Sequence, residues 1–169
     1  MEDIRFILTG EISLVYTQDG KGRRVHLLMF VPSFEVVKKI NSYLDKKGRR
    51  DYDGRPIFNI SCIDFVKDMK EISDDIEIIP AHCWTPWFGV FGSKSGFNSL
   101  KEAFGEQENK IYAIETGMSN PPETVSVNVP LVKSISSASG YCQNAIQAVV
   151  TKTFSGFKDN NNSKSTLGL

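Results

Sequence analysis

Short apolar runs separated by polar residues open the chain, and this alternation predicts β-strands. Residues 4–9 (IRFILT), 12–17 (ISLVYT) and 25–31 (VHLLMFV) are rich in β-branched and aromatic residues and are too short for ordinary helices. Asp19 and Gly20 lie between the second and third runs, and this dipeptide favours a tight hairpin turn. The first part of the chain is therefore predicted to form hairpin-like strands.

Beyond these strands the apolar residues recur every three to four positions, as they do on the buried side of a helix. Ser33 is a suitable N-cap for a first helix that Gly48 ends. Ser61 is a suitable N-cap for a second helix that continues to about Ile72, and Asn98 for a third, short helix. The middle of the chain is therefore predicted to be largely helical.

Two more apolar runs, residues 76–82 and 110–115, interleave with the helices and are predicted strands. Strands that alternate with helices indicate an α/β layered or barrel fold with a largely parallel sheet. In such folds the chemistry lies at the carboxyl ends of the strands. The ends of the predicted strands are therefore the first place to look for a site.

Glu11, His82 and Glu115 each lie at or just past the end of a predicted strand. His26 lies near the start of its strand, which fits the same site only if that strand runs antiparallel to the others. Neutral imidazole and carboxylate are ordinary ligands for zinc and manganese. The spacing of the four residues is no local metal motif, however, and a histidine beside an apolar run is more often structural. Both readings remain open from the pattern alone.

Residues 83–97 form a long predicted loop with a glycine-rich end, and its large aromatic side chains include Trp84, Trp87, Phe88 and Phe91. The aromatic residues suit the stacking of nucleic-acid bases, and they equally suit a packed lid over a barrel. The GSKSG stretch at 92–96 offers donors to an anion, or is an ordinary surface loop. Arg55 in the preceding GRP turn is a candidate phosphate clamp.

The composition narrows the class of protein without deciding its function. A chain of 169 residues with 40% hydrophobic and 24% charged residues suits a single globular domain. The formal net charge is zero, so the molecule as a whole does not attract nucleic acid or membranes, although a local basic surface is compatible with this. The chain begins with no signal peptide, has no apolar run approaching the ~20 residues of a membrane span, and has only three cysteines. We therefore expect a cytoplasmic protein without a membrane partner.

The amino-acid composition of the sequence changes near residue 119. Residues 120–169 are rich in Ser, Val and Asn, are poor in acidic residues, and end in KDNNNSKSTLGL. Sequences of this kind bury too little apolar surface to order themselves. The chain is therefore predicted to hold one domain at 1–119 and a divergent, poorly ordered C-terminal tail at 120–169.

Five stretches, in chain order, resemble consecutive motifs of one protein family. They are TGEISLVYTQ, RRVHLLMFVPS, DGRPIFNIS, IPAHCWTPWFGVFGSKSGF and IYAIETGMS. Over about residues 4–119 the sequence resembles endonuclease Q and its bacterial relatives, within the polymerase-and-histidinol-phosphatase (PHP) phosphoesterases. The resemblance implies a distorted β/α barrel that holds up to three zinc or manganese ions at its strand ends and nicks DNA beside deaminated bases.

Carried over residue by residue, the resemblance implies that Glu11, His26 and His82 are metal ligands. Such ions activate water and neutralise phosphate oxygens. Glu115 matches a position that the family keeps, and we expect it to orient a ligand. The loop after His82 and the GRP turn then become candidates for a DNA-binding groove. The residues expected to contact DNA are Arg55, Trp84, Trp87, Ser93, Lys94 and Ser95.

The sequence also departs from the family pattern at both ends. No His-x-His precedes Glu11, and no histidine follows His82, where the family has an Asp-x-His motif. We therefore expect a partial barrel, a fragment that is inactive alone unless a second polypeptide completes it, and a tail that arose by frameshift or fusion. The alternatives are a DNA-binding module that does not cleave and a remnant without function.

Overall fold

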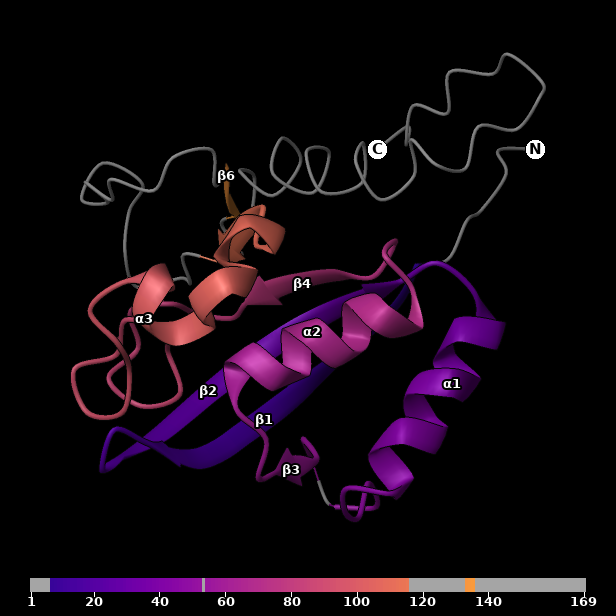
Figure 1. Cartoon of the computed structure of the whole chain (residues 1–169), viewed down its shortest axis with the longest axis horizontal. Helices are drawn as coiled ribbons and strands as arrows, with labels where there is room; N and C mark the ends of the chain where they lie inside the picture. Colours follow the sequence, from indigo (N-terminus) through magenta and orange to yellow (C-terminus); the bar gives the residue numbers. More distant parts are fainter. Residues whose placement is uncertain (1–6, 53, 116–132, 136–169) are drawn as a thin grey trace.

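The computed structural model describes residues 7–52, 54–115 and 133–135 (Figure 1). Four strands form one sheet in the order β3-β1-β2-β4. Their bounds are Leu8–Gln18 for β1, Lys21–Val31 for β2, Ile57–Phe58 for β3 and Glu77–Pro80 for β4.

A long hairpin of β1 and β2 dominates this sheet. The two strands pair antiparallel along their whole length, from Leu8 opposite Val31 to Gln18 opposite Lys21. Both turn residues have left-handed backbones, with φ of 52° at Asp19 and 73° at Gly20, as in the type I′ turns of hairpins. The predicted turn is confirmed. The predicted break after residue 9 is wrong, because the ladder continues through that point as one strand.

The sheet is mixed, so the prediction of a largely parallel sheet is wrong. β3 runs parallel to β1, whereas β4 runs antiparallel to β2. The cause is local: two strands joined by a two-residue turn must run in opposite directions. The fold is mixed α/β, and the described residues form an open sheet rather than a closed barrel.

Two amphipathic helices cover one face of this sheet, and α2 crosses in front of β1 and β2 in Figure 1. Helix α1 spans Phe34–Asp45 and helix α2 spans Cys62–Ile72. The hydroxyl of Ser33 accepts from Val36 N, and that of Ser61 accepts from Asp64 N, so both predicted N-caps are confirmed. Helix α1 ends before Gly48, the predicted stop.

The third helix differs from its prediction by one residue. Helix α3 spans Leu100–Phe104, and Ser99 rather than Asn98 is its N-cap, because the Ser99 hydroxyl accepts from Glu102 N. A 3-10 helix, η1, follows at Gly105–Lys110 and was not predicted. Gly105 joins the two with φ of 56°, a conformation that favours glycine.

The core lies between the helices and the side chains of alternate strand residues. On β2, Val25 and Leu27 are fully buried on this face, and Phe58 of β3 joins them at 2% exposure. Strand β3 was not predicted, because it consists of only two residues, and only the second, Phe58, is buried. The burial of these apolar side chains therefore holds the sheet against the helices.

A second, separate pair of strands lies beside β4. Strand β5 spans Ala113–Glu115 and pairs parallel with β6, Lys133–Ile135. Strand β6 falls within the stretch predicted to be a tail, and the remainder of that stretch, with Cys142, lies outside the described residues. Among the described residues no helix is both long and apolar enough to cross a membrane.

Candidate metal centre

Three predicted metal ligands come together on the face of the sheet that the helices leave uncovered. Ligand atoms of Glu11, His26 and His82 all lie within 4.8 Å of one another. His26 Nδ1 lies 3.3 Å from Glu11 Oε1 and 3.0 Å from His82 Nε2. Three side chains that are far apart in sequence thus direct ligand atoms towards one point.

The hairpin register explains the first pair. His26 lies directly opposite Ser13, so it shares a face with Glu11, which is two residues away along β1. Glu11 therefore lies inside a strand, and its predicted place at a strand end is wrong. The antiparallel direction of β2, on which the place of His26 in the site depended, is confirmed.

His82 follows β4 in a sharply turned backbone. Its φ is 33°, which is in the left-handed region that non-glycine residues rarely adopt. Just before it, Ala81 N donates to His26 O at 3.0 Å, so the strand pairing holds the turn beside His26. Strained backbone of this kind persists where the surroundings fix it, and it is common at functional sites.

Glu115 at the end of β5 holds His82 in place. Its Oε2 accepts the backbone N–H of His82 at 2.7 Å and lies 3.6 Å from His82 Nδ1, on the far side of the ring from the cluster. Hydrogen bonding from His82 holds the pKa of Glu115 below its usual value. A carboxylate behind a histidine is the usual means of orienting a metal-binding imidazole.

His26 is held from a different direction. Its ring stacks on Phe88 with centroids 4.3 Å apart, and its backbone N–H donates to Phe88 O at 2.9 Å. The side chain is 11% exposed. Burial, together with the nearby His82 and Arg55, lowers the pKa of His26 to about 4. The ring is therefore neutral at pH 7, which is the form that binds metals.

The polar atoms around the cluster fit a divalent cation. Glu11 Oε1 is buried and accepts no hydrogen bond of good geometry among the described residues, although Arg55 Nε lies 2.6 Å away. Ser13, opposite His26, is 2% exposed, and its hydroxyl has no hydrogen-bond partner in the described part of the chain. The two ring nitrogens are 3.0 Å apart, close to the separation of about 3.3 Å for two nitrogens on a tetrahedral zinc. Two imidazoles and a carboxylate suit zinc or manganese.

The GSKSG loop is packed tightly on itself. A Cβ on Gly92 or on Gly96 would lie 2.3 Å from another backbone atom, so both positions require glycine. The amides of Gly92, Lys94 and Gly96 donate to the carbonyl groups of Gly89, Pro86 and Gly92, respectively. The glycines therefore allow close packing of the loop, and these three amides are already used rather than open to an anion.

Some side chains of this loop are buried and hydrogen-bonded within the protein, and others are exposed to solvent. Ser95 is buried, and its hydroxyl donates to Arg24 O and accepts from Phe88 N. Ser93 and Lys94 are exposed. Only the latter two side chains lie where a ligand reaches them without rearrangement of the loop.

An arginine that the sequence analysis did not single out ties this loop to the sheet. Arg23 is 5% exposed and lies with its guanidinium 4.0 Å from the centre of the Phe97 ring. It also pairs with Glu102 of α3 at 2.7 Å and donates to Gly96 O. The loop therefore has a fixed position relative to the hairpin.

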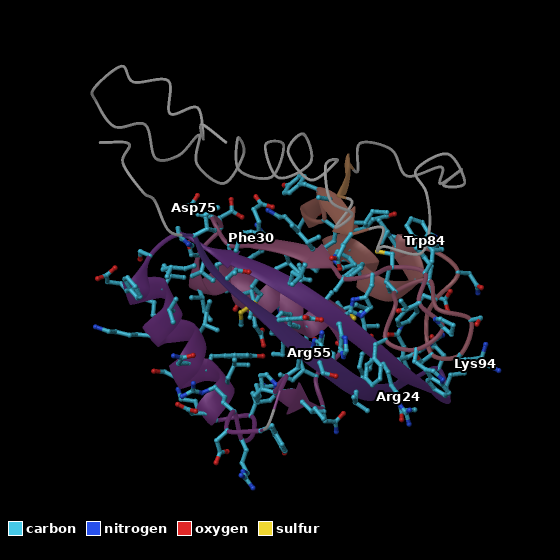
Figure 2. All side chains as sticks on the ribbon, turned by 180° about the vertical axis from the view of Figure 1, so that it is seen from behind. Arg24, Phe30, Arg55, Asp75, Trp84 and Lys94 are labelled. Carbon is cyan, nitrogen blue, oxygen red and sulfur yellow. The ribbon has the colours of Figure 1, made fainter. Side chains whose placement is uncertain are left out.

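The two tryptophans differ in their surroundings. Trp84 packs on Phe91 and on the edge of the core. Trp87 is 49% exposed, and the Arg24 guanidinium lies 5.0 Å from its ring centre. Figure 2 shows Arg24 and Arg55 on the side of the sheet away from α2, and Lys94 on the loop beyond the edge of the hairpin. Arg24 was missed by the sequence analysis, although its spacing of two from His26 places it on the same face.

Two solved structures are similar to this chain. One is an endonuclease Q complex with a 27-mer duplex substrate with an abasic lesion at the active site, at 28% identity and a TM-score of 0.53 over 66% of this chain. The other is the lesion-specific endonuclease PfuEndoQ from Pyrococcus furiosus, at 30% identity and a TM-score of 0.50 over 57% of this chain. The resemblance to endonuclease Q inferred from the motifs is confirmed. The chain spans about a quarter of the length of these structures, 25% and 23% respectively. No protein-family model and no curated protein matches the sequence significantly.

Proposed function

We propose that this chain carries a divalent-metal site of a PHP-type DNA phosphoesterase that acts at lesions, in the manner of endonuclease Q. The observation that carries the proposal is the convergence of Glu11, His26 and His82, whose ligand atoms lie within 4.8 Å of one another. Similarity to an endonuclease Q complex with a duplex substrate and to a lesion-specific endonuclease supports DNA as the substrate. The bond to be cleaved is a DNA phosphodiester beside an abasic or deaminated nucleotide.

In this proposal Glu11, His26 and His82 hold a zinc or manganese ion, which supplies Lewis-acid activation of water and of the phosphate. Three protein ligands leave coordination positions open for substrate. Glu115 fixes the orientation of His82 through the contacts described above. The stacking of Phe88 on His26 holds the imidazole in place.

DNA contacts are proposed on the same side of the sheet. The exposed ring of Trp87, beside the Arg24 guanidinium, suits stacking on a base, which typically contributes about 1–3 kcal/mol. Ser93 and Lys94 suit contacts to the phosphate backbone, and Arg55 suits a phosphate close to the cluster. Trp84 and Ser95 then support the loop rather than contact DNA, because both are engaged within it.

A second candidate function is DNA binding without cleavage. It is favoured by the small number of ligands, because the described residues hold one cluster of three and no second cluster for a further ion. Under this candidate the surface around the exposed ring of Trp87 still binds DNA. Cleavage then requires a second polypeptide that completes the site. The two candidates differ only in whether the metal-loaded chain nicks DNA.

The experiment compares metal binding and nicking by the purified chain. Isothermal titration with Zn²⁺ or Mn²⁺ measures affinity, and duplexes that contain an abasic site, uracil or hypoxanthine test cleavage. Glu11→Gln removes the carboxylate and is expected to weaken metal binding at least about 100-fold, more than the loss of a supporting residue. The matched control is Glu71→Gln on the exposed side of α2, which is expected to bind metal as the parent does.

The outcomes separate the two candidates. Metal binding with nicking supports the phosphoesterase. Metal binding and DNA binding without nicking, the latter followed through Trp fluorescence, supports the second candidate. A chain that binds neither metal, or a Glu11→Gln variant that binds it as tightly as the parent does, contradicts the proposed site.

A further inference from the structure

Arg55 contacts the same carboxylate oxygen that faces the metal cluster. Its Nε lies 2.6 Å from Glu11 Oε1, the oxygen that is 3.3 Å from His26 Nδ1. Glu11 is 21% exposed and Arg55 is 48% exposed, so the pair lies at the boundary between the cluster and solvent. The guanidinium is thus the positive charge that neutralises Glu11 in this structure.

A guanidinium and a divalent cation compete for this oxygen. Oε1 accepts no hydrogen bond of good geometry, so Arg55 holds it by charge and proximity. A metal ion bound to Oε1 would place two more positive charges beside the guanidinium, and like charges at such distances repel strongly. Occupation of the cluster therefore favours the departure of Arg55 from Glu11.

The backbone around Arg55 is fixed, whereas its side chain has room to turn. Ser13 N donates to Pro56 O at 2.9 Å, and Ser13 pairs with Ile57, so the residues after Arg55 are tied to β1 beside the cluster. Half of the Arg55 side chain already faces solvent. Figure 2 shows it over the open face of the hairpin. The side chain therefore stays within reach of an anion at this face after it leaves Glu11.

We propose that Arg55 is a positioning residue with two alternating partners: it neutralises Glu11 while the cluster lacks metal, and it turns to a phosphate group when a metal takes its place. The inference rests on the proposed metal site and extends it. The planar fork of an arginine matches two phosphate oxygens, so the residue suits the second partner as well as the first. Substrate phosphate and metal would then favour each other's binding through one side chain.

The test is a pair of titrations on the full chain, with Arg55→Gln as the variant. The first measures Mn²⁺ affinity, which is expected to rise about two- to fivefold because the competing charge is gone. The second measures inorganic phosphate binding to the Mn²⁺-loaded chain, which is expected to weaken about tenfold. Opposite signs in the two titrations are the signature of a residue that changes partners.

The matched control is Arg50→Gln in the same turn region. Arg50 pairs with Asp45 at 2.6 Å, the same length as the Arg55–Glu11 contact, but neither residue belongs to the cluster. This variant is expected to leave both titrations unchanged. A Lys at position 55 keeps the charge without the fork, so Arg55→Lys is expected to retain the parent's Mn²⁺ affinity while phosphate binding weakens.

The outcomes distinguish this inference from the proposed function. If Arg55→Gln binds Mn²⁺ no better than the parent, the exchange is contradicted although the metal site stands. If phosphate binding is unchanged in Arg55→Gln, the second partner is contradicted. If the parent binds no Mn²⁺, the proposed metal site and this inference both fail.

Discussion

The two faces of the β1–β2 hairpin are built from the same strands but differ in burial, in polarity and in how fully their polar groups are hydrogen-bonded. On the helix-covered face, Ile12, Leu14, Val25 and Leu27 are fully buried among apolar neighbours. On the other face, the same strands present Glu11, Ser13, His26 and Arg24, most of them partly exposed or without a full set of hydrogen bonds. A shift of one residue in register would exchange the two faces. The apolar face therefore fixes the position of the polar one.

The comparison also shows where unfavourable features are tolerated. Two left-handed non-glycine residues, His82 and Phe88, contact His26 on the polar face. The buried oxygens of Glu11 and Ser13 without a hydrogen-bond partner are on that face too, while Tyr16 Oη and Arg23 Nε are unpaired on the opposite face. Local rules are most often broken at functional sites, where another part of the fold supplies the stability. If this division holds, the helix-covered face supplies most of the stability of the fold, and the polar face carries the candidate site.

The largest expected effect is on the free energy of unfolding, and it is seen by comparing substitutions of two adjacent leucines of β2. Leu27 faces the helices and is fully buried, so Leu27→Ala is expected to lower the free energy of unfolding by about 2–5 kcal/mol. Leu28 faces the other side and is partly buried, so Leu28→Ala is expected to lower it by about 1 kcal/mol. Urea denaturation of the metal-free chain measures both. Equal losses would show that the open face stabilises the fold as much as the core does.

Acid is expected to destabilise the metal-free chain through the polar face. The pKa of His26 is about 4 in the folded chain and 6.5 when it is unperturbed, so the unfolded chain binds more protons between these values. The free energy of unfolding is therefore expected to fall as the pH drops from about 6.5 towards 4, by up to about 3 kcal/mol. Denaturation across this range measures the fall.

A variant isolates the contribution of His26 to this pH dependence. Glu115 has a lowered pKa, so the stability that it contributes is lost only as the pH falls below 4.5, its unperturbed value. Between pH 4.5 and 6.5, His26→Gln is therefore expected to flatten the curve. A slope that survives this substitution would assign the acid sensitivity to other groups.

The smallest expected effect concerns the loop that follows His82. A Cβ on Gly96 would lie 2.3 Å from Gly92 N, so Gly96→Ala must displace backbone and is expected to lower the free energy of unfolding by about 1–3 kcal/mol. The matched control is Gly22→Ala, where a Cβ meets no atom within 4 Å and a change within about 0.5 kcal/mol is expected. Thermal or urea unfolding measures both. If the two variants behave alike, the backbone around Gly96 is not packed closely enough to exclude a Cβ.

Local signals in the sequence predicted most of the turns and caps that local chemistry decides, although the cap of the third helix was placed one residue too early. The Asp19-Gly20 turn and the Ser33 and Ser61 caps were predicted correctly, because each depends on residues within three positions of itself. Strand β3 was not predicted, because its pairing partner on β1 lies far along the chain. The mixed direction of the sheet follows from the two-residue hairpin turn, which the prediction of a largely parallel sheet left out of account. The same limit of remote partners explains why Arg23 was not singled out, because its contacts with Phe97 and Glu102 are to remote residues, whereas the spacing of Arg24 from His26 is a local signal.

The sequence by itself determined which side chains are available for chemistry at this site: two histidines, an early glutamate and an aromatic loop, in motifs that resemble endonuclease Q. Only the tertiary structure decided that Glu11, His26 and His82 meet, since this depends on the hairpin register and on the turned backbone at His82. It also decided that Arg55 lies on Glu11 and that the loop glycines serve packing. The physical reason is that residue types are fixed by the chain alone, whereas distances between remote residues are fixed by the burial of the opposite, apolar face.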